Sequence, residues 1–295
     1  MDFFHFIYNE DIKERAFAYL FSLCDSAEML YAYRDYEEDD LELAALGTEY
    51  ENIIPSITGK RRGDIYGMEG RVYTFALTEE FKNIFIRGGL SAMPQILTGV
   101  RLENLTLLKG GKMKYAVCSH EGYDDFDEDF KKKVEDFCRK EIVQTQLYAE
   151  TLERYKKLPG HTRNERAVIR SKLYDLTAQV EDAWEKYVRD KPLWKMSYHE
   201  YLKLAEPVFS AEVYEKLAKA GSYRGLQPDG FPHTFAEARS FKGVEDFGET
   251  ELMIEIKKQL DMLEAVFCIE EGFDDWHVDG EEEWTPTIIM NEERK

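Results

Sequence analysis

The chain has 295 residues and a mass of 34.6 kDa, and its composition is 43% hydrophobic and 14% aromatic. A compact fold of this size removes roughly three quarters of the unfolded surface from water, so the chain can bury a core without disulfides or a structural metal. This composition excludes disordered and fibrous proteins. The net charge of −20, from 59 acidic and 39 basic residues, argues against nucleic acids and membranes as partners, because both require clustered Lys and Arg.

Three features predict a cytoplasmic location. No apolar run approaches the roughly 20 residues that cross a bilayer. The first residues, MDFFHFIYNED, are acidic where a signal peptide would be basic. The cysteines lie far apart without a C-x-x-C pair, which is typical of reduced thiols; they are Cys24, Cys118, Cys138 and Cys268.

The first half of the chain predicts one helix followed by a sheet. Apolar residues at three- and four-residue steps predict an amphipathic helix over 12–34. Short apolar runs at 72–77, 84–86 and 102–108 predict strands. In 105–117, the Gly110-Gly111 pair supplies the positive φ angles of a two-residue hairpin turn. We therefore expect an antiparallel sheet over about 50–120.

The second half predicts mainly helices. Residues 123–158 contain no Gly or Pro, and 161–191 form a second such stretch, so the two predict a long antiparallel helical hairpin. Ser197-x-x-Glu200 and Thr234-x-x-Glu237 have capping-box form, and Ser210 predicts the cap of a short helix that ends at Gly221. A further helix is expected over 250–264, with strands at 265–269 and 285–290.

Strands in one block and helices in another predict an α+β fold, in which an antiparallel sheet with added C-terminal strands packs against helices. We expect three segments. Residues 1–122 hold the first helix and the sheet, and 123–191 hold the helical hairpin. Residues 192–295 hold short helices and returning strands that join 1–122 in one compact unit.

Three acidic tracts without Lys or Arg carry the whole charge excess. The first tract, Asp35–Glu42, and the second, Glu121–Asp129, hold six acidic residues each, and the third, Glu270–Glu283, holds eight. Such segments complement a basic protein or a cation. The simpler alternative is a set of solvated loops that keep the protein soluble. Aromatic residues inside the tracts favour an interface, unless their rings only attach the loops to the core.

The second and third tracts also resemble each other. CSHEGYDDFDED at 118–129 aligns without gaps to CIEEGFDDWHVD at 268–279. This similarity suggests two apolar strands that each end in an acidic turn, and a duplication of the chain is the alternative. We therefore expect 121–129 and 270–283 to lie on one side of the folded protein.

The leading hypothesis is a non-catalytic protein that docks a basic protein, as an immunity or inhibitor protein does with a basic toxin. No motif for a cofactor or a nucleotide is present, and we expect no catalytic residue. The candidate partner-binding residues are the acids and aromatic rings of the second and third tracts: Asp124, Asp125, Phe126, Asp274, Asp275, Trp276, Glu281 and Glu282.

Two other functions use the same acids. Asp274, His277 and Asp279 have donor types that suit a divalent cation, which leads to a metal-dependent hydrolase as an alternative. A nucleic-acid mimic is the other alternative, and it requires acids in rows at phosphate-like spacing. Cys118 and His120 offer a weak Cys-His pair. The basic triplet 60–62 suggests a phosphate loop or a segment held against the chain's own acids.

Overall fold

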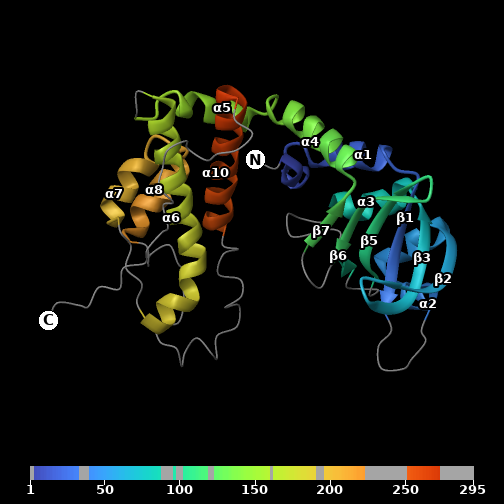
Figure 1. Ribbon diagram of the computed structural model, residues 1–295. Coiled ribbons are helices and arrows are strands. Elements are labelled where there is room, and N and C mark those ends of the chain that lie inside the picture. Colours follow the sequence, from blue (N-terminus) through green and yellow to red (C-terminus); the bar gives the residue numbers. More distant parts are fainter. Residues whose placement is uncertain are drawn as a thin grey trace. The chain divides into compact units, whose positions relative to one another are not determined.

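The computed structural model describes residues 3–32, 40–87, 96–97, 102–118, 123–159, 162–190, 196–222 and 251–272 (Figure 1). The chain divides into two compact units, an N-terminal unit of residues 2–145 and a C-terminal unit of residues 146–295. The division expected from the sequence, into 1–122, 123–191 and 192–295, stays a prediction.

The N-terminal unit is an antiparallel sheet packed with helices, as the α+β prediction required. Its strands are β1 (Ser26–Ala32), β2 (Ile57–Ile65), β3 (Met68–Ala76), β4 (Ile96–Leu97), β5 (Leu102–Lys109), β6 (Lys112–Cys118) and β7 (Tyr123–Phe126). Their order is β2-β3-β1-β5-β6-β7, and β4 pairs with β5. The helices are η1 (Phe3–Tyr8), α1 (Lys13–Ser22), α2 (Leu41–Ala44), η2 (Glu49–Ser56), α3 (Glu79–Arg87) and α4 (Glu128–Ile142).

Aromatic side chains pack the helices of this unit against its sheet. The ring of Phe4 in η1 lies 4.5 Å from Phe126 in β7, and Phe81 in α3 lies 4.9 Å from Phe75 in β3, both measured between centroids. Phe75 and Phe81 are fully buried. Aromatic rings therefore join the helices to both halves of the sheet.

The sheet is strongly coiled. Tyr66, in the turn between β2 and β3, donates from its hydroxyl to Asp125 Oδ2 in β7 at 2.7 Å, although β2 and β7 end the strand order. Asn104 in β5 also donates to the Ile65 carbonyl at 3.4 Å. Gly70 in β3 permits a close approach to β1, because a Cβ atom at this position would collide with the Tyr31 carbonyl oxygen.

Several local predictions for this unit are confirmed and two are wrong. The β5–β6 hairpin turns at Gly110 and Gly111 with φ of 56° and 71°. The helix predicted over 12–34 ends at Ser22, and its second half is the strand β1. The strand predicted at 84–86 is the end of α3, since Phe81 and Phe85 are buried four residues apart on one helical face.

The C-terminal unit is helical in the part that the structure describes. Its elements are α5 (Gln146–Tyr155), α6 (Arg163–Asp190), α7 (Tyr198–Ala205), α8 (Ala211–Ala220) and α10 (Glu251–Glu271). α10 packs against α5, α6 and α8, and Figure 1 shows α6 beside it. The buried face of α10 carries Ile256, Leu260, Leu263 and Phe267. No helix in the described ranges is long and apolar enough to cross a membrane.

The capping predictions in this unit are confirmed where they can be compared with the structure. Ser197 and Glu200 form a capping box on α7. Ser210 caps α8, which ends at Gly221 with φ of 71°. Thr234 and Glu237 lie outside the described residues.

Two longer-range predictions are corrected. The segment 265–269, which was expected to be a strand, is part of α10. Its four consecutive buried residues resemble a buried strand in the sequence, but they are equally compatible with a helix that is packed on several sides. The first arm of the expected hairpin, 123–158, is three elements: β7, α4 and α5. Tyr123–Phe126 pairs with β6, and the helix breaks where Thr145 donates to the Ile142 carbonyl. The strand expected at 285–290 lies outside the described residues.

Candidate functional site

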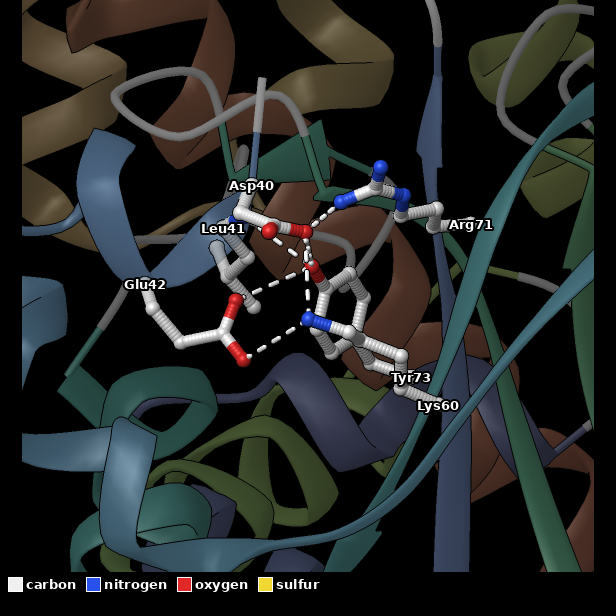
Figure 2. A network of polar contacts seen from close by, with 6 residues as sticks. All are labelled: Asp40, Leu41, Glu42, Lys60, Arg71 and Tyr73. Atoms are coloured by element: carbon white, nitrogen blue, oxygen red, sulfur yellow. Dashed lines mark hydrogen bonds and ion pairs between the residues drawn. The ribbon is translucent and has the colours of Figure 1, made fainter. Parts of the chain in front are cut away.

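The described end of the first acidic tract is held by a network of polar contacts. Figure 2 shows its members, which are Asp40, Leu41, Glu42, Lys60, Arg71 and Tyr73. The hydroxyl of Tyr73 lies 3.2 Å from Asp40 Oδ1 and 3.1 Å from Glu42 Oε2, and it accepts from the Leu41 N–H at 3.1 Å. Tyr73 is fully buried, and its hydroxyl gives the buried Leu41 N–H a hydrogen-bond partner.

Basic side chains complete this network from β2 and β3. Lys60 Nζ lies 3.2 Å from Asp40 Oδ1 and 3.4 Å from Glu42 Oε1, and Arg71 also pairs with Asp40. The side chains of Lys60, Asp40 and Glu42 are 42%, 34% and 38% exposed, so water screens the Lys60 pairs and they stabilise the fold only weakly. The segment is therefore held by the buried tyrosine together with Arg71, whose side chain is 16% exposed.

The titration of this network follows from its surroundings. Burial raises the pKa of Tyr73 to about 12, and the neighbouring Glu42 carboxylate adds to this effect. Burial alone would raise the pKa of Glu42, but hydrogen bonds from its own backbone, from Tyr73 and from Lys60 lower it overall. At neutral pH the tyrosine therefore stays a neutral donor, and Glu42 stays a carboxylate.

The basic triplet 60–62 lies in β2, and Lys60 and Arg61 pair with acids of the chain. Lys60 contacts the first tract as described above. Arg61 Nη2 lies 2.9 Å from Glu28 Oε2 in β1. These contacts support the interpretation of the triplet as a segment held by the chain's own acids, although it lies in a strand and not in a loop.

The second tract places three candidate partner-binding residues in β7. Asp124 accepts from the Tyr115 hydroxyl at 3.4 Å, and Asp125, which is exposed, accepts from Tyr66. Phe126 packs between Phe4 and Tyr115, with its centroid 4.5 Å and 5.1 Å from theirs. The ring of Phe126 therefore attaches this tract to the core, which was the alternative to an interface role.

Asp127, at the end of the same tract, begins α4. Its carboxylate accepts from the Phe130 N–H at 3.1 Å and pairs with Lys114 Nζ at 2.8 Å. The hydrogen bond from Lys114, followed by that from the Phe130 N–H, lowers the pKa of Asp127. This carboxylate therefore serves as an N-cap.

The third tract begins at the end of α10. Glu270 accepts from the Tyr148 hydroxyl at 2.9 Å, and Glu271 accepts from Tyr155 at 2.9 Å and pairs with Arg166 at 2.8 Å. Burial would raise the pKa of Glu271, but the hydrogen bonds from Arg166 and Tyr155 lower it overall. A tyrosine hydroxyl thus holds carboxylates in each of the three tracts.

The remaining sequence-predicted site residues lie outside the described part of the chain: Asp274, Asp275, Trp276, His277, Asp279, Glu281 and Glu282. The expected placement of 121–129 and 270–283 on one side of the protein therefore also stays a prediction. Among the described residues, no group of three or more His, Cys, Asp and Glu side chains could hold a metal ion.

The four cysteines are free thiols, and all are buried. Burial raises the pKa of Cys24 to about 11 and that of Cys138 to about 12, which keeps both protonated at neutral pH. Cys118 lies in β6 and is 3% exposed, and His120 lies outside the described residues. A buried thiol is poorly placed to attack a substrate.

Sequence reasoning missed the tyrosines that hold the acids, and it missed two exposed leucines, Leu43 and Leu46. Tyr73 lies more than 30 residues along the chain from the carboxylates that it contacts, so no local sequence pattern could predict these contacts. The leucines had a weak signal, because they directly follow an acidic tract. Comparison with protein-family models, with curated proteins and with solved structures finds no match to this chain.

Proposed function

We propose that this chain is a non-catalytic cytoplasmic protein that docks a basic protein partner through its acidic tracts, as an immunity or inhibitor protein would. The observation that carries the proposal is the repeated tyrosine–carboxylate contact. Asp40 and Glu42, Asp124 and Asp125, and Glu270 and Glu271 all accept from tyrosine hydroxyls at 2.7 to 3.4 Å.

The chemistry of these contacts supports a docking role. A phenol orients a carboxylate without cancelling its charge, as at Asp125 and Glu270. Asp40, Glu42 and Glu271 are in addition paired with Lys or Arg of the chain. Burial is the first reason that the pKa values of Tyr115 and Tyr148 are raised, so both remain neutral donors. Carboxylates that are fixed before binding lose little conformational freedom when Lys or Arg of a partner approaches.

The charge distribution supports the same proposal. The twenty acids of the three tracts equal the net charge of −20, so the rest of the chain is neutral. Clustered charge of one sign accelerates the encounter with a partner of opposite sign and disfavours like-charged molecules. The resulting complex should weaken with salt, because exposed charges separated by more than about 8 Å are screened at physiological ionic strength.

The test compares two charge variants of equal size on immobilised full-length chain. The tract variant replaces five acids by Asn or Gln: Asp274, Asp275, Glu281, Glu282 and Glu283. The control variant does the same with five exposed acids outside the tracts, Glu10, Glu14, Glu80, Asp136 and Glu206. We expect wild type and control to capture basic proteins from cytoplasm at low salt, and the tract variant to associate with them more slowly.

Two results would contradict the proposal. If no basic protein is retained at low salt, the docking role has no support. If the control variant loses as much capture as the tract variant, only the net charge matters and the tracts have no special role. Circular dichroism of both variants checks that each remains folded.

A further inference from the structure

Two leucines project from the N-terminal unit beside the first acidic tract. Leu43 is 66% exposed and Leu46 is 61% exposed, the highest values among the large hydrophobic side chains that the structure describes. They lie three residues apart on one helical turn, where the Leu46 N–H donates to the Leu43 carbonyl at 3.4 Å. Such residues are neighbours on a helix surface. Leu41 and Ala45 of the same turn are fully buried.

The backbone that carries these leucines is fixed on both sides. The backbone carbonyl of Asp40 accepts from the Leu43 N–H at 3.0 Å, and the Asp40 side chain belongs to the Tyr73 network of Figure 2. On the other side, the Thr48 hydroxyl donates to the Ala45 carbonyl at 2.7 Å. A surface fixed in this way loses little entropy on binding.

Carboxylates flank the leucine pair. Glu42 precedes Leu43, and its side chain is 38% exposed and paired with Lys60. After Leu46, the carboxylate of Glu51 accepts from the Gly47 N–H at 3.0 Å, and Glu49 is exposed. The sequence contains no Lys or Arg between Arg34 and Lys60. An apolar centre within a charged rim is the usual anatomy of a protein interface.

We propose that Leu43 and Leu46 are the apolar anchors of a docking surface for an amphipathic, basic helix of another protein. The apolar stripe of that helix packs on the two leucines, and its Lys and Arg side chains reach Glu49 and Glu51. A second copy of this chain fits poorly, because it would bring the same acids face to face. This inference rests on the proposed function and adds the class of partner segment.

The test uses two synthetic 18-residue peptides of the same composition, made of Leu and Lys. One places its leucines on a single helical face, and the other distributes them around the helix. Their affinity for full-length chain is measured by fluorescence anisotropy at low and high salt. The variant Leu43→Ser/Leu46→Ser is compared with the control Met113→Ser/Val143→Ser, whose residues are 41% and 40% exposed.

We expect the amphipathic peptide to bind more tightly than its isomer, and the Leu43→Ser/Leu46→Ser variant to weaken that binding by about tenfold or more. The control variant should change it by less than about threefold. Hydrogen exchange should show the amides of 43–52 protected by the amphipathic peptide in wild type and not in the leucine variant. Circular dichroism checks the fold of each variant.

The two proposals fail in different ways. Equal affinity of wild type and leucine variant for the amphipathic peptide overturns the leucine inference, and salt-sensitive binding of both peptides then leaves the proposed function standing. If neither peptide binds at low salt, both proposals are wrong.

Discussion

Tyr73 shows how one buried hydroxyl positions charged groups on the surface. It contacts both carboxylates at the end of the first acidic tract and accepts from a backbone N–H between them. An apolar ring in its place would leave these groups to find water at the edge of the core. The tyrosine therefore contributes to the stability of the fold and also to the shape of the acidic surface.

We expect Tyr73→Phe to lower the free energy of unfolding of the N-terminal unit by about 1–3 kcal/mol, the usual cost of leaving buried polar groups without a partner. Hydrogen exchange of β1 and β3 measures this change in the full-length chain. Tyr50→Phe is the control, because Tyr50 is partly exposed and should change the value by less than about 0.5 kcal/mol. Equal effects of the two substitutions would contradict the assigned role.

The lowered pKa of Glu42 predicts a dependence of stability on pH. A carboxyl whose folded pKa lies below its unfolded value of about 4.3 stabilises the fold above that value, and this contribution is lost as pH falls through the folded pKa. The urea midpoints of wild type and Glu42→Gln should therefore differ by a constant amount from about pH 7 to 5 and converge at lower pH. A difference that persists unchanged at pH 3 would contradict this sign.

The metal-dependent alternative is tested at Asp274, His277 and Asp279. We expect calorimetric titration with Mn²⁺ or Zn²⁺ to show weak uptake at many sites that salt abolishes, as solvated carboxylates give. A tight site would instead raise stability by about 2.7 kcal/mol at a hundredfold excess over its dissociation constant. One tight site that disappears in His277→Ala would replace the docking proposal with the hydrolase.

Among the elements, the start of α8 depends on a contact with α10. Ser210 caps the helix by accepting from the Val213 N–H at 3.4 Å. Gln259 accepts from the Ser210 N–H at 2.7 Å and donates to its hydroxyl at 3.0 Å. The cap and the packing of the two helices are therefore coupled.

We expect Ser210→Ala to cost about 1 kcal/mol, as loss of an N-cap does. Gln259→Ala should also destabilise the unit, and the double variant should cost less than the sum, with a coupling of about 0.5 kcal/mol or more. Urea unfolding followed by tryptophan fluorescence measures all three variants. Strict additivity would show that the cap acts independently of α10.

The accuracy of sequence reasoning varied between elements for physical reasons. Turn and cap signals such as Gly110-Gly111 and Ser210 depend on local backbone geometry, so they were predicted correctly. β1 was mistaken for helix because it is buried between two neighbouring strands, and its consecutive apolar residues Met29, Leu30 and Tyr31 match helical spacing as well as a buried strand.

The candidate site was predicted only in part. The sequence locates the acids, since charge is visible in it, and the docking role of these acids stays a prediction. The sequence cannot identify the tyrosines that donate hydrogen bonds to these acids. Tyr66 and Asp125, for example, are 59 residues apart and come into contact only because the sheet coils. The exposure of Leu43 and Leu46 was also missed. The sequence does not show which apolar residues of this turn face the core, and in the structure these are Leu41 and Ala45.

At the scale of the whole molecule, the two units carry different spectroscopic probes. All four tryptophans, at 184, 194, 276 and 284, lie in the C-terminal unit of residues 146–295. We expect urea unfolding followed by tryptophan fluorescence to report that unit alone, while circular dichroism reports both. Different midpoints for the two probes would show separate unfolding. Coincident transitions would contradict independent units, and a fragment of residues 1–145 provides the control.

The central position of β1 has a consequence for synthesis on the ribosome. β1 is the first strand made, yet its neighbours are β3 at 68–76 and β5 at 102–109. At translation rates of about 5–20 residues per second, several seconds pass between the synthesis of β1 and that of β5, and until then one edge of β1 has no neighbouring strand. Its apolar residues stay open to other nascent chains during that interval. We expect chaperones that recognise apolar strands to bind the nascent chain at β1 and to dissociate once β5 has emerged from the ribosome.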